Sequence, residues 1–405
     1  MDTGVKTVFL IIPELGMGGA QRSLAKLSIE LSKIYKVYLI VFNTNYNIPY
    51  LVGGTLISLD IAAGKTFFDK SMQFYKRVVR LKKLKRLYLP VTSISFLEGA
   101  DFINILTKSQ DRVIVSVRGS KLYDETIQGR FKWLRLKVLI PILYNKADYI
   151  VTVNNGIRNE LVESYNFNSK KLKVINNFYN IEEIQKKANE TLDIKLSSYL
   201  EGKKVIAMSG RYAVEKGQKY VIQLLAELKE SVKNVALLLI GDGPEFDDLK
   251  RLCAENQLKY SDYPILDIGT EVLFIRKELN IFKIIRKADL YVLCSSSEGF
   301  PNGIAEAMIC GVPIIASDCP YGPREILVSD TGKHNVEFGV LLPVFQNCQT
   351  KEEYFSCLKI WVKTTRSMLE NDQLNEFYKK RGLERASAYT KENALRQWKS
   401  LIDKK

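Results

Sequence analysis

Short apolar runs rich in β-branched residues alternate with stretches of helical hydrophobic spacing along almost the whole chain. This alternation is typical of a largely parallel sheet whose crossover helices cover both faces. We therefore expect an α/β protein with doubly wound parallel sheets. The expected strands are residues 7–12, 37–42, 56–61, 92–97, 112–117, 149–153 and 173–176, and then 205–209, 235–240, 265–268, 290–295, 313–317 and 340–343.

The alternation restarts after a polar stretch, residues 182–201, so the 405 residues divide into two domains. We expect residues 1–185 to form the first domain and residues 186–373 the second. The last helical stretch, residues 374–405, is expected to pack back on the first domain. Two such sheets would leave a cleft between them, and ligands bind outside the carboxyl ends of parallel strands.

Composition excludes several classes of function. No stretch approaches the roughly 18 uncharged apolar residues that span a bilayer, and no signal-peptide pattern precedes the first strand, so we expect a cytoplasmic protein. The six cysteines form no CxxC pair and are expected to be reduced thiols. His334 is the only histidine, which argues against a zinc site or a Ser-His-Asp triad.

The first glycine-rich turn contains Gly18 and Gly19, between the first strand and a helix that begins near Ala20. Glycines let amide groups approach an anion at a helix N-terminus. The turn lacks the G-x-G-x-x-G pattern, and Phe42 and Asn43 stand where an acidic residue would end the second strand, so a nicotinamide dehydrogenase is disfavoured. A purely structural turn is the alternative.

Two cations, Arg211 and Lys216, lie on the loop after the first strand of the second domain. Five residues apart, a guanidinium and an ammonium can converge on a diphosphate. Ordinary surface charges are the alternative.

Two carboxylates follow strand 290–295, Glu298 on the loop and Glu306 inside the next helix. Carboxylates accept hydrogen bonds from vicinal hydroxyls, so the pair could hold a sugar and a ribose. Asn302 is the expected N-cap, which would direct the amides of Gly303 and Ile304 toward an anion. A supporting role for Glu306 at the helix start is the alternative.

Five ordered motifs together resemble the GT-B-type retaining glycosyltransferases of family 4: Gly18-Gly19-Ala20-Gln21-Arg22, Arg211 with Lys216-Gly217, Gly241-Asp242-Gly243-Pro244, Glu298 with Glu306, and Gly311 to Asp318. The resemblance implies two Rossmann-like domains facing across a cleft and a nucleotide-sugar donor, preferably UDP-linked. It also implies front-face transfer with retention of configuration and no metal or other cofactor.

The resemblance assigns roles at matching positions. Arg211 and Lys216 would neutralise the diphosphate, Glu298 would bind sugar hydroxyls and Glu306 the ribose. The base would lie against a loop near residues 272–274, including Phe274. The remaining donor contacts would come from Gly18, Gly19, Gly299, Phe300, Asn302, Gly303 and Ile304.

One departure from the family concerns the first domain. Many relatives carry a histidine near the sugar, whereas here strand 113–117 is followed by Arg118, which we expect to meet the acceptor or the sugar. Residues 318–327 resemble members that build bacterial surface polysaccharides, often with N-acetylhexosamine donors.

The net charge of +15 is concentrated in the first half, where residues 1–185 hold 27 Lys and Arg against 15 Asp and Glu. A helix interleaving cations with aromatic residues can bind anionic lipid headgroups, and residues 130–137, with Phe131 and Trp133, would extend the patch. A solvated helix face is the alternative. The cations of residues 65–86 are Lys65, Lys70, Lys76, Arg77, Arg80, Lys82, Lys83, Lys85 and Arg86.

We therefore expect a hexosyltransferase that is peripheral on the inner face of the cell membrane and acts on a lipid-linked or polysaccharide acceptor. A GT-B-shaped epimerase or hydrolase is the nearer alternative, but it would usually need more acid and base groups than this histidine-poor chain offers. A non-enzymatic nucleic-acid-binding protein is the more distant alternative, and we expect no nucleic-acid partner because no separate set of stacking aromatics is evident.

Overall fold

The computed structural model describes residues 4–46, 48–123, 132–276, 278–330 and 335–404. The chain forms two compact units, residues 1–177 with 392–405, and residues 178–391. The division falls eight residues before the expected boundary, and residues 374–391 lie in the second unit rather than the first. His334, Arg130 and Phe131 lie outside the described residues.

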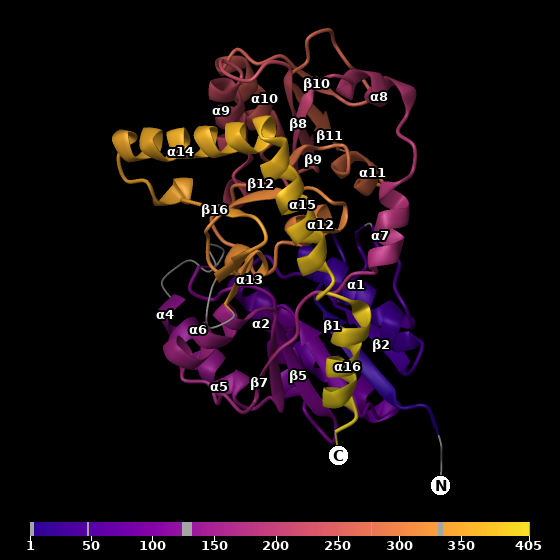
Figure 1. The fold of residues 1–405 in the computed structure, drawn as a ribbon. Helices are drawn as coiled ribbons and strands as arrows, with labels where there is room; N and C mark the ends of the chain where they lie inside the picture. Colours follow the sequence, from indigo (N-terminus) through magenta and orange to yellow (C-terminus); the bar gives the residue numbers. More distant parts are fainter. Residues whose placement is uncertain (1–3, 47, 124–131, 277, 331–334, 405) are drawn as a thin grey trace. The chain divides into compact units, whose positions relative to one another are not determined.

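The first unit contains the predicted parallel sheet (Figure 1). Seven strands are ordered β3-β2-β1-β4-β5-β6-β7, and every neighbouring pair is parallel. Strands β1 and β4 are almost wholly buried at its centre, as their apolar and small residues require. The strands are β1 (Thr7–Ile12), β2 (Lys36–Val41), β3 (Thr55–Ser58), β4 (Thr92–Phe96), β5 (Arg112–Val117), β6 (Tyr149–Thr152) and β7 (Leu172–Val174).

Helices flank this sheet, and the last of them comes from the far end of the chain (Figure 1). The Trp398 ring stacks on Phe96 with centroids 6.4 Å apart, and Arg112 donates to the carbonyls of Leu401 and Ile402. The helices are α1 (Gly19–Ser32), α2 (Phe67–Tyr88), α3 (Glu98–Leu106), α4 (Lys132–Leu134), the π-helical turn η1 (Arg135–Leu139), α5 (Ile140–Tyr144), α6 (Asn155–Tyr165) and α16 (Lys391–Ile402).

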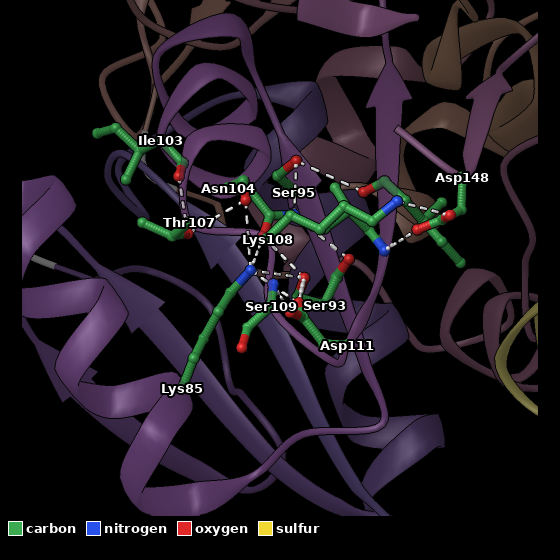
Figure 2. Close-up of polar contacts among 12 residues, drawn as sticks. Lys85, Ser93, Ser95, Ile103, Asn104, Thr107, Lys108, Ser109, Asp111 and Asp148 are labelled. Carbon is green, nitrogen blue, oxygen red and sulfur yellow. Dashed lines mark hydrogen bonds and ion pairs between the residues drawn. The ribbon is translucent and has the colours of Figure 1, made fainter. Parts of the chain in front are cut away.

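A buried ion pair fixes the C-terminal end of α2 to the sheet (Figure 2). The Lys85 ammonium lies 2.7 Å from an Asp111 carboxylate oxygen and also donates to Ser93 and to the side chain of Asn104. Asp111 in turn accepts from the Ser109 amide. Burial lowers the pKa of Lys85, and Asp111 opposes this shift. Lys85 is therefore a structural cation and not a surface charge.

The second unit holds the second predicted sheet, with strand order β10-β11-β9-β8-β12-β13-β16, again all parallel (Figure 1). A short antiparallel pair, β14 (Val328–Asp330) and β15 (Asn335–Glu337), stands apart from it. The strands of the main sheet are β8 (Lys204–Ser209), β9 (Val235–Ile240), β10 (Tyr260–Asp262), β11 (Val272–Ile275), β12 (Leu290–Leu293), β13 (Ile314–Ser317) and β16 (Val340–Leu342).

The expected strand at residues 265–268 is wrong. Ile265 and Ile268 are largely exposed, and the chain turns there because the Ser261 hydroxyl binds both Asp267 and Thr270. The sheet instead takes β10 before this turn and β11 after it. The more continuous apolar run, β11, occupies the buried position.

The helices of the second unit connect its strands and continue into a C-terminal pair, α14 and α15 (Figure 1). None of the helices within the described ranges is both long and apolar enough to cross a bilayer. The helices are α7 (Ile181–Ala188), α8 (Ile194–Leu200), the 3-10 turn η2 (Val214–Lys216), α9 (Gln218–Leu228), α10 (Phe246–Glu255), α11 (Phe282–Ile285), α12 (Asn302–Ile309), α13 (Gly322–Leu327), the 3-10 turn η3 (Phe345–Asn347), α14 (Lys351–Glu370) and α15 (Asp372–Ala386).

Candidate functional site

The loops after β8 and β9 are locked together at the carboxyl edge of the second sheet. Gly241 has φ 148°, and a Cβ atom there would lie 2.0 Å from the Gly210 carbonyl oxygen. The Tyr212 amide donates to the Asp242 carbonyl at 2.9 Å. These contacts fix the backbone around Arg211, so glycine is needed at position 241 for the two loops to approach each other.

Lys216 is held at the end of η2 by the residue that follows it. Gly217 has φ 73°, and a Cβ atom there would lie 2.2 Å from the Cys294 carbonyl oxygen. A side chain at 217 would therefore push η2 away from the end of β12. This close approach brings the Lys216 ammonium 2.7 Å from a Glu298 carboxylate oxygen, to which the Ser295 hydroxyl also donates at 2.8 Å.

Glu298 lies on an ordered segment after β12. Its amide donates to the Pro320 carbonyl at 2.8 Å, and its carbonyl accepts from the amides of Tyr321 and Gly322 at 3.0 Å. These bonds tie the 298 loop to the start of α13. The Glu298 carboxylate is thus positioned by backbone contacts and by Lys216 together.

Arg211 is turned toward a different partner. Its guanidinium donates to Glu215 at 2.7 Å, and its side chain is 60% exposed. Burial raises the pKa of Glu215, but backbone hydrogen bonding and Arg211 outweigh it and hold that pKa below its ordinary value. The structure thus brings Lys216 and Glu298 into contact and places Arg211 in a separate ion pair.

The start of α12 differs from two expectations, the N-cap at Asn302 and an Ile304 amide directed toward an anion. Pro301, in an extended conformation, is the N-cap, and Asn302 is the first helical residue, whose side-chain oxygen accepts from the Tyr179 hydroxyl. The Ile304 amide donates to the Pro301 carbonyl at 3.1 Å, so it takes part in the first turn. The expected cap fails because the Asn302 side chain binds the tyrosine hydroxyl.

Side chains around α12 pack into the second unit. Ile304 is fully buried, and Phe300 packs edge-on against Tyr389 with centroids 5.3 Å apart, so any donor contact of these two residues is left to their backbone. A Cβ atom at Gly303 would lie 2.1 Å from the Tyr291 hydroxyl oxygen. Gly303 therefore permits the helix start to rest on Tyr291.

Glu306 is almost fully buried, with 1% of its surface exposed. Burial raises the pKa of nearby Tyr291 to about 12; hydrogen bonds from Ser209 oppose this, while the charges of Glu306 and Glu298 add to it. Tyr291 therefore stays protonated at neutral pH, and its hydroxyl, which bonds to Ser209, lies against the helix start at Gly303. The sequence contained no signal for this tyrosine, because its strand is apolar.

Phe274 is not on a loop. It lies within β11, fully buried, with its ring centroid 5.4 Å from Phe246 and 6.1 Å from Tyr212. The loop begins one position after the strand, at Arg276, which donates twice to Asp242 and lies 3.9 Å over the Phe246 ring. The error follows from the misplaced strand 265–268.

The other predicted residues belong to the first unit. Gly18 precedes α1, where its amide donates to the Tyr50 hydroxyl at 3.1 Å, and Gly19 is the first residue of that helix. Arg118 follows β5, donates to Ser23 and Asn177, and lies 5.0 Å over the Phe96 ring. No group of acidic, cysteine or histidine residues in the described parts of the chain could hold a metal ion.

Comparison with known proteins places these motifs in context. Residues 189–338 match the model of the family "Glycosyl transferases group 1". Over 390 residues the chain is 28% identical to the N-acetylgalactosamine-N,N'-diacetylbacillosaminyl-diphospho-undecaprenol 4-alpha-N-acetylgalactosaminyltransferase of Campylobacter jejuni, covering 94% of this chain and 95% of that enzyme. It is 26% identical over 223 residues to the capsular polysaccharide biosynthesis glycosyltransferase CapM of Staphylococcus aureus, covering 54% and 55%.

A solved structure matches the fold over nearly the whole chain. HepE of Anabaena, crystallised with UDP and glucose, superposes with a TM-score of 0.74 over 99% of this chain and 100% of that chain, at 16% identity. The predicted architecture of two doubly wound parallel sheets is confirmed. The chain is therefore a glycosyltransferase of GT-B fold, and its residues 189–338 form a glycosyl transferases group 1 domain.

Proposed function

We propose that the chain is a retaining glycosyltransferase of family 4 that moves a hexose or N-acetylhexosamine from a UDP-linked sugar to a lipid-linked or polysaccharide acceptor in bacterial surface-glycan synthesis. The observation that carries the proposal is the Lys216–Glu298 contact at the carboxyl edge of the second sheet. The names of the Campylobacter and Staphylococcus relatives support the acceptor class.

The proposed chemistry follows from the charges at this edge. Lys216 stabilises the negative charge that grows on the diphosphate as the glycosidic bond breaks. Arg211 joins it by leaving Glu215, which costs little because an exposed ion pair contributes about 1 kcal/mol or less. Glu298 accepts hydrogen bonds from sugar hydroxyls, and Glu306 accepts those of the ribose.

Retention of configuration requires no protein nucleophile in this proposal. The acceptor hydroxyl attacks the anomeric carbon from the face that the diphosphate leaves, and a departing phosphate oxygen takes the hydroxyl proton. The new glycosidic bond therefore has the configuration of the broken one. The chain's own part is to hold the diphosphate through Lys216 and the sugar through Glu298.

A donor screen tests this function. We expect nucleoside diphosphate release from one or more UDP-sugars, stimulated by a lipid extract that contains glycan acceptors, with the product linkage retaining the donor configuration by NMR. GDP-sugars are the matched comparison set. Release that is unaffected by any acceptor would indicate a hydrolase instead, and absence of release from every nucleotide sugar would contradict the proposal.

The proposed acceptor lipid requires a membrane contact, and α2 has the composition for it. Its inner face, including Phe74, Val78 and Leu81, packs on the first sheet. A second apolar stripe faces outward at helical spacing, and its members are each more than two-fifths exposed: Phe67, Phe68, Met72, Tyr75 and Val79.

The exposed stripe is surrounded by cations. Of the nine basic residues predicted for this surface, seven are exposed, whereas Lys85 is buried and Arg77 donates to the carbonyls of Ile61 and Ala62. Apolar groups that enter the lipid interface beside cations that meet anionic headgroups make a peripheral membrane helix. We therefore propose that the protein binds the inner face of the cell membrane through the outer side of α2.

Vesicle binding tests this surface. We expect the protein to sediment with vesicles containing anionic phosphatidylglycerol at low salt and much less with purely zwitterionic vesicles or at high salt, because salt screens headgroup attraction. A Phe67→Ser/Phe68→Ser variant should bind at least several-fold more weakly. Phe355→Ser, at an exposed phenylalanine on α14, is the control. Binding that ignores lipid charge and the α2 variant would contradict the membrane role.

A further inference from the structure

Three charged side chains that belong to none of the five sequence motifs meet at the carboxyl edge of the first sheet. Glu98 opens α3 directly after β4, Lys121 follows β5, and Arg135 opens η1. The Lys121 ammonium lies 3.1 Å from one Glu98 oxygen, and Arg135 Nε donates to the other. We call these three residues the edge triad.

Lys121 lies on a loop that is held by hydrogen bonds to a buried carboxylate. Glu160 of α6, only 4% exposed, accepts from the Ser120 hydroxyl, from the Lys121 amide at 2.7 Å and from the Leu122 amide at 3.2 Å. The same loop begins at Arg118, which α1 and Asn177 hold in place. Buried hydrogen bonds thus hold a row of polar side chains at the edge where parallel sheets bind their ligands.

Glu98 is the carboxylate of the edge triad, and Asp101, one turn behind it in α3, is almost fully buried. Burial raises the pKa of Asp101 to about 7, and Lys121 and the Tyr144 hydroxyl only partly oppose it. Burial also raises the pKa of Glu98, but Lys121 and Arg135 outweigh it and keep that carboxylate ionised. The edge therefore offers one acceptor carboxylate between two cations.

A purely structural role does not explain the edge triad well. Removing charges from water costs several kcal/mol per ion, and a well-packed apolar cluster is often at least as stable. The Glu98 and Lys121 side chains keep about a tenth of their surface exposed and Arg135 keeps 40%, so the triad is open to solvent mainly at Arg135. Polar groups that are fixed, charged and reachable are what a binding site requires.

We propose that the edge triad recognises the acceptor: Lys121 and Arg135 bind the diphosphate of a phosphate-linked sugar, and Glu98 accepts a hydrogen bond from a hydroxyl or amide N–H of that sugar. This inference rests on the proposed function and deepens it. Glu98 is then a specificity-determining residue, because a site built to hydrogen-bond a substrate hydroxyl or N–H discriminates against sugars that lack that group.

Calorimetry in the presence of saturating UDP tests the proposal, because UDP occupies the donor site and leaves the edge triad available. The probe is N-acetylglucosaminyl diphosphate farnesol, and the comparison ligand is the methyl glycoside of N-acetylglucosamine, which lacks the diphosphate. We expect the wild type to bind the probe more tightly than the comparison ligand. Lys121→Met should weaken probe binding about tenfold or more and remove that preference.

Glu98→Gln separates recognition from stability. We expect weaker binding of both sugar ligands, with UDP affinity unchanged within about twofold. The matched control is Lys108→Met, a change before β5 that breaks the ion pair between Lys108 and Asp148. A variant with a lower melting temperature but unchanged probe affinity would show that the edge triad is structural, and failure of the wild type to bind the probe would overturn the proposal. Absence of UDP binding would instead count against the proposed function.

Discussion

Replacing Lys216 with alanine is expected to lower kcat about 10²–10³-fold, the usual effect of removing one preorganised charge contact from a developing anion. The ammonium is held 2.7 Å from a Glu298 carboxylate oxygen, and alanine leaves no cation on this side chain. The donor KM should rise less than kcat falls, because the negative charge is greatest in the transition state. Steady-state release of nucleoside diphosphate with the donor identified by screening measures both constants.

Lys219→Ala is the matched control for this experiment. Lys219 is an exposed lysine on α9, three residues further along the chain, and its ammonium lies 4.8 Å from the Tyr220 ring centroid. The Lys219→Ala variant should retain wild-type kcat within about twofold, as expected for a surface charge outside the site. If Lys216→Ala also retains wild-type kcat, the assignment of the donor diphosphate to this edge is wrong.

Replacing Lys85 with methionine is expected to cost about 3–5 kcal/mol of the stability of the first unit, because Asp111 would remain buried without its ion-pair partner. Two units need not unfold together, so a single melting curve is not the best measure. Hydrogen exchange of β4 and β5 amides reports the opening free energy of this sheet directly. We expect those amides to lose protection while β8 and β9 keep theirs.

Two further variants test whether the broken ion pair causes the loss of amide protection in Lys85→Met. Lys83→Met removes an exposed cation two residues away on α2 and should change protection by less than about 0.5 kcal/mol. Lys85→Met combined with Asp111→Leu removes both charges and should recover much of the loss. Equal protection in Lys85→Met and wild type would mean that the ion pair contributes no net stability.

Much of the fold was predictable because hydrophobic periodicity reports burial. The strands of the first sheet match their predicted ranges closely, since most are short apolar runs between helical patterns. The failure at residues 265–268 has a local cause, because three polar side chains close a turn there and leave its isoleucines exposed. Periodicity cannot reveal which of two neighbouring apolar runs the sheet accepts.

The site was predictable only in part. The sequence pattern placed Lys216 and Glu298 on loops after two strands of the second sheet, and the structure brings them together. The partner of Arg211, the cap of α12 and the edge triad depend on which rotamers and which distant residues meet. Glu98 and Arg135 are 37 residues apart, and no local pattern indicates their contact.

The position of α16 means that the first unit is a discontinuous domain, with the whole second unit inserted between residues 177 and 392. During synthesis the ribosome must therefore finish residues 178–391 before Trp398 can cover Phe96. The second unit can therefore complete its sheet before the first unit is complete, although translation of the first unit begins earlier. A fragment ending at residue 177 would leave that face of the first sheet open to solvent, whereas a permuted chain that joins α16 ahead of β1 would restore it.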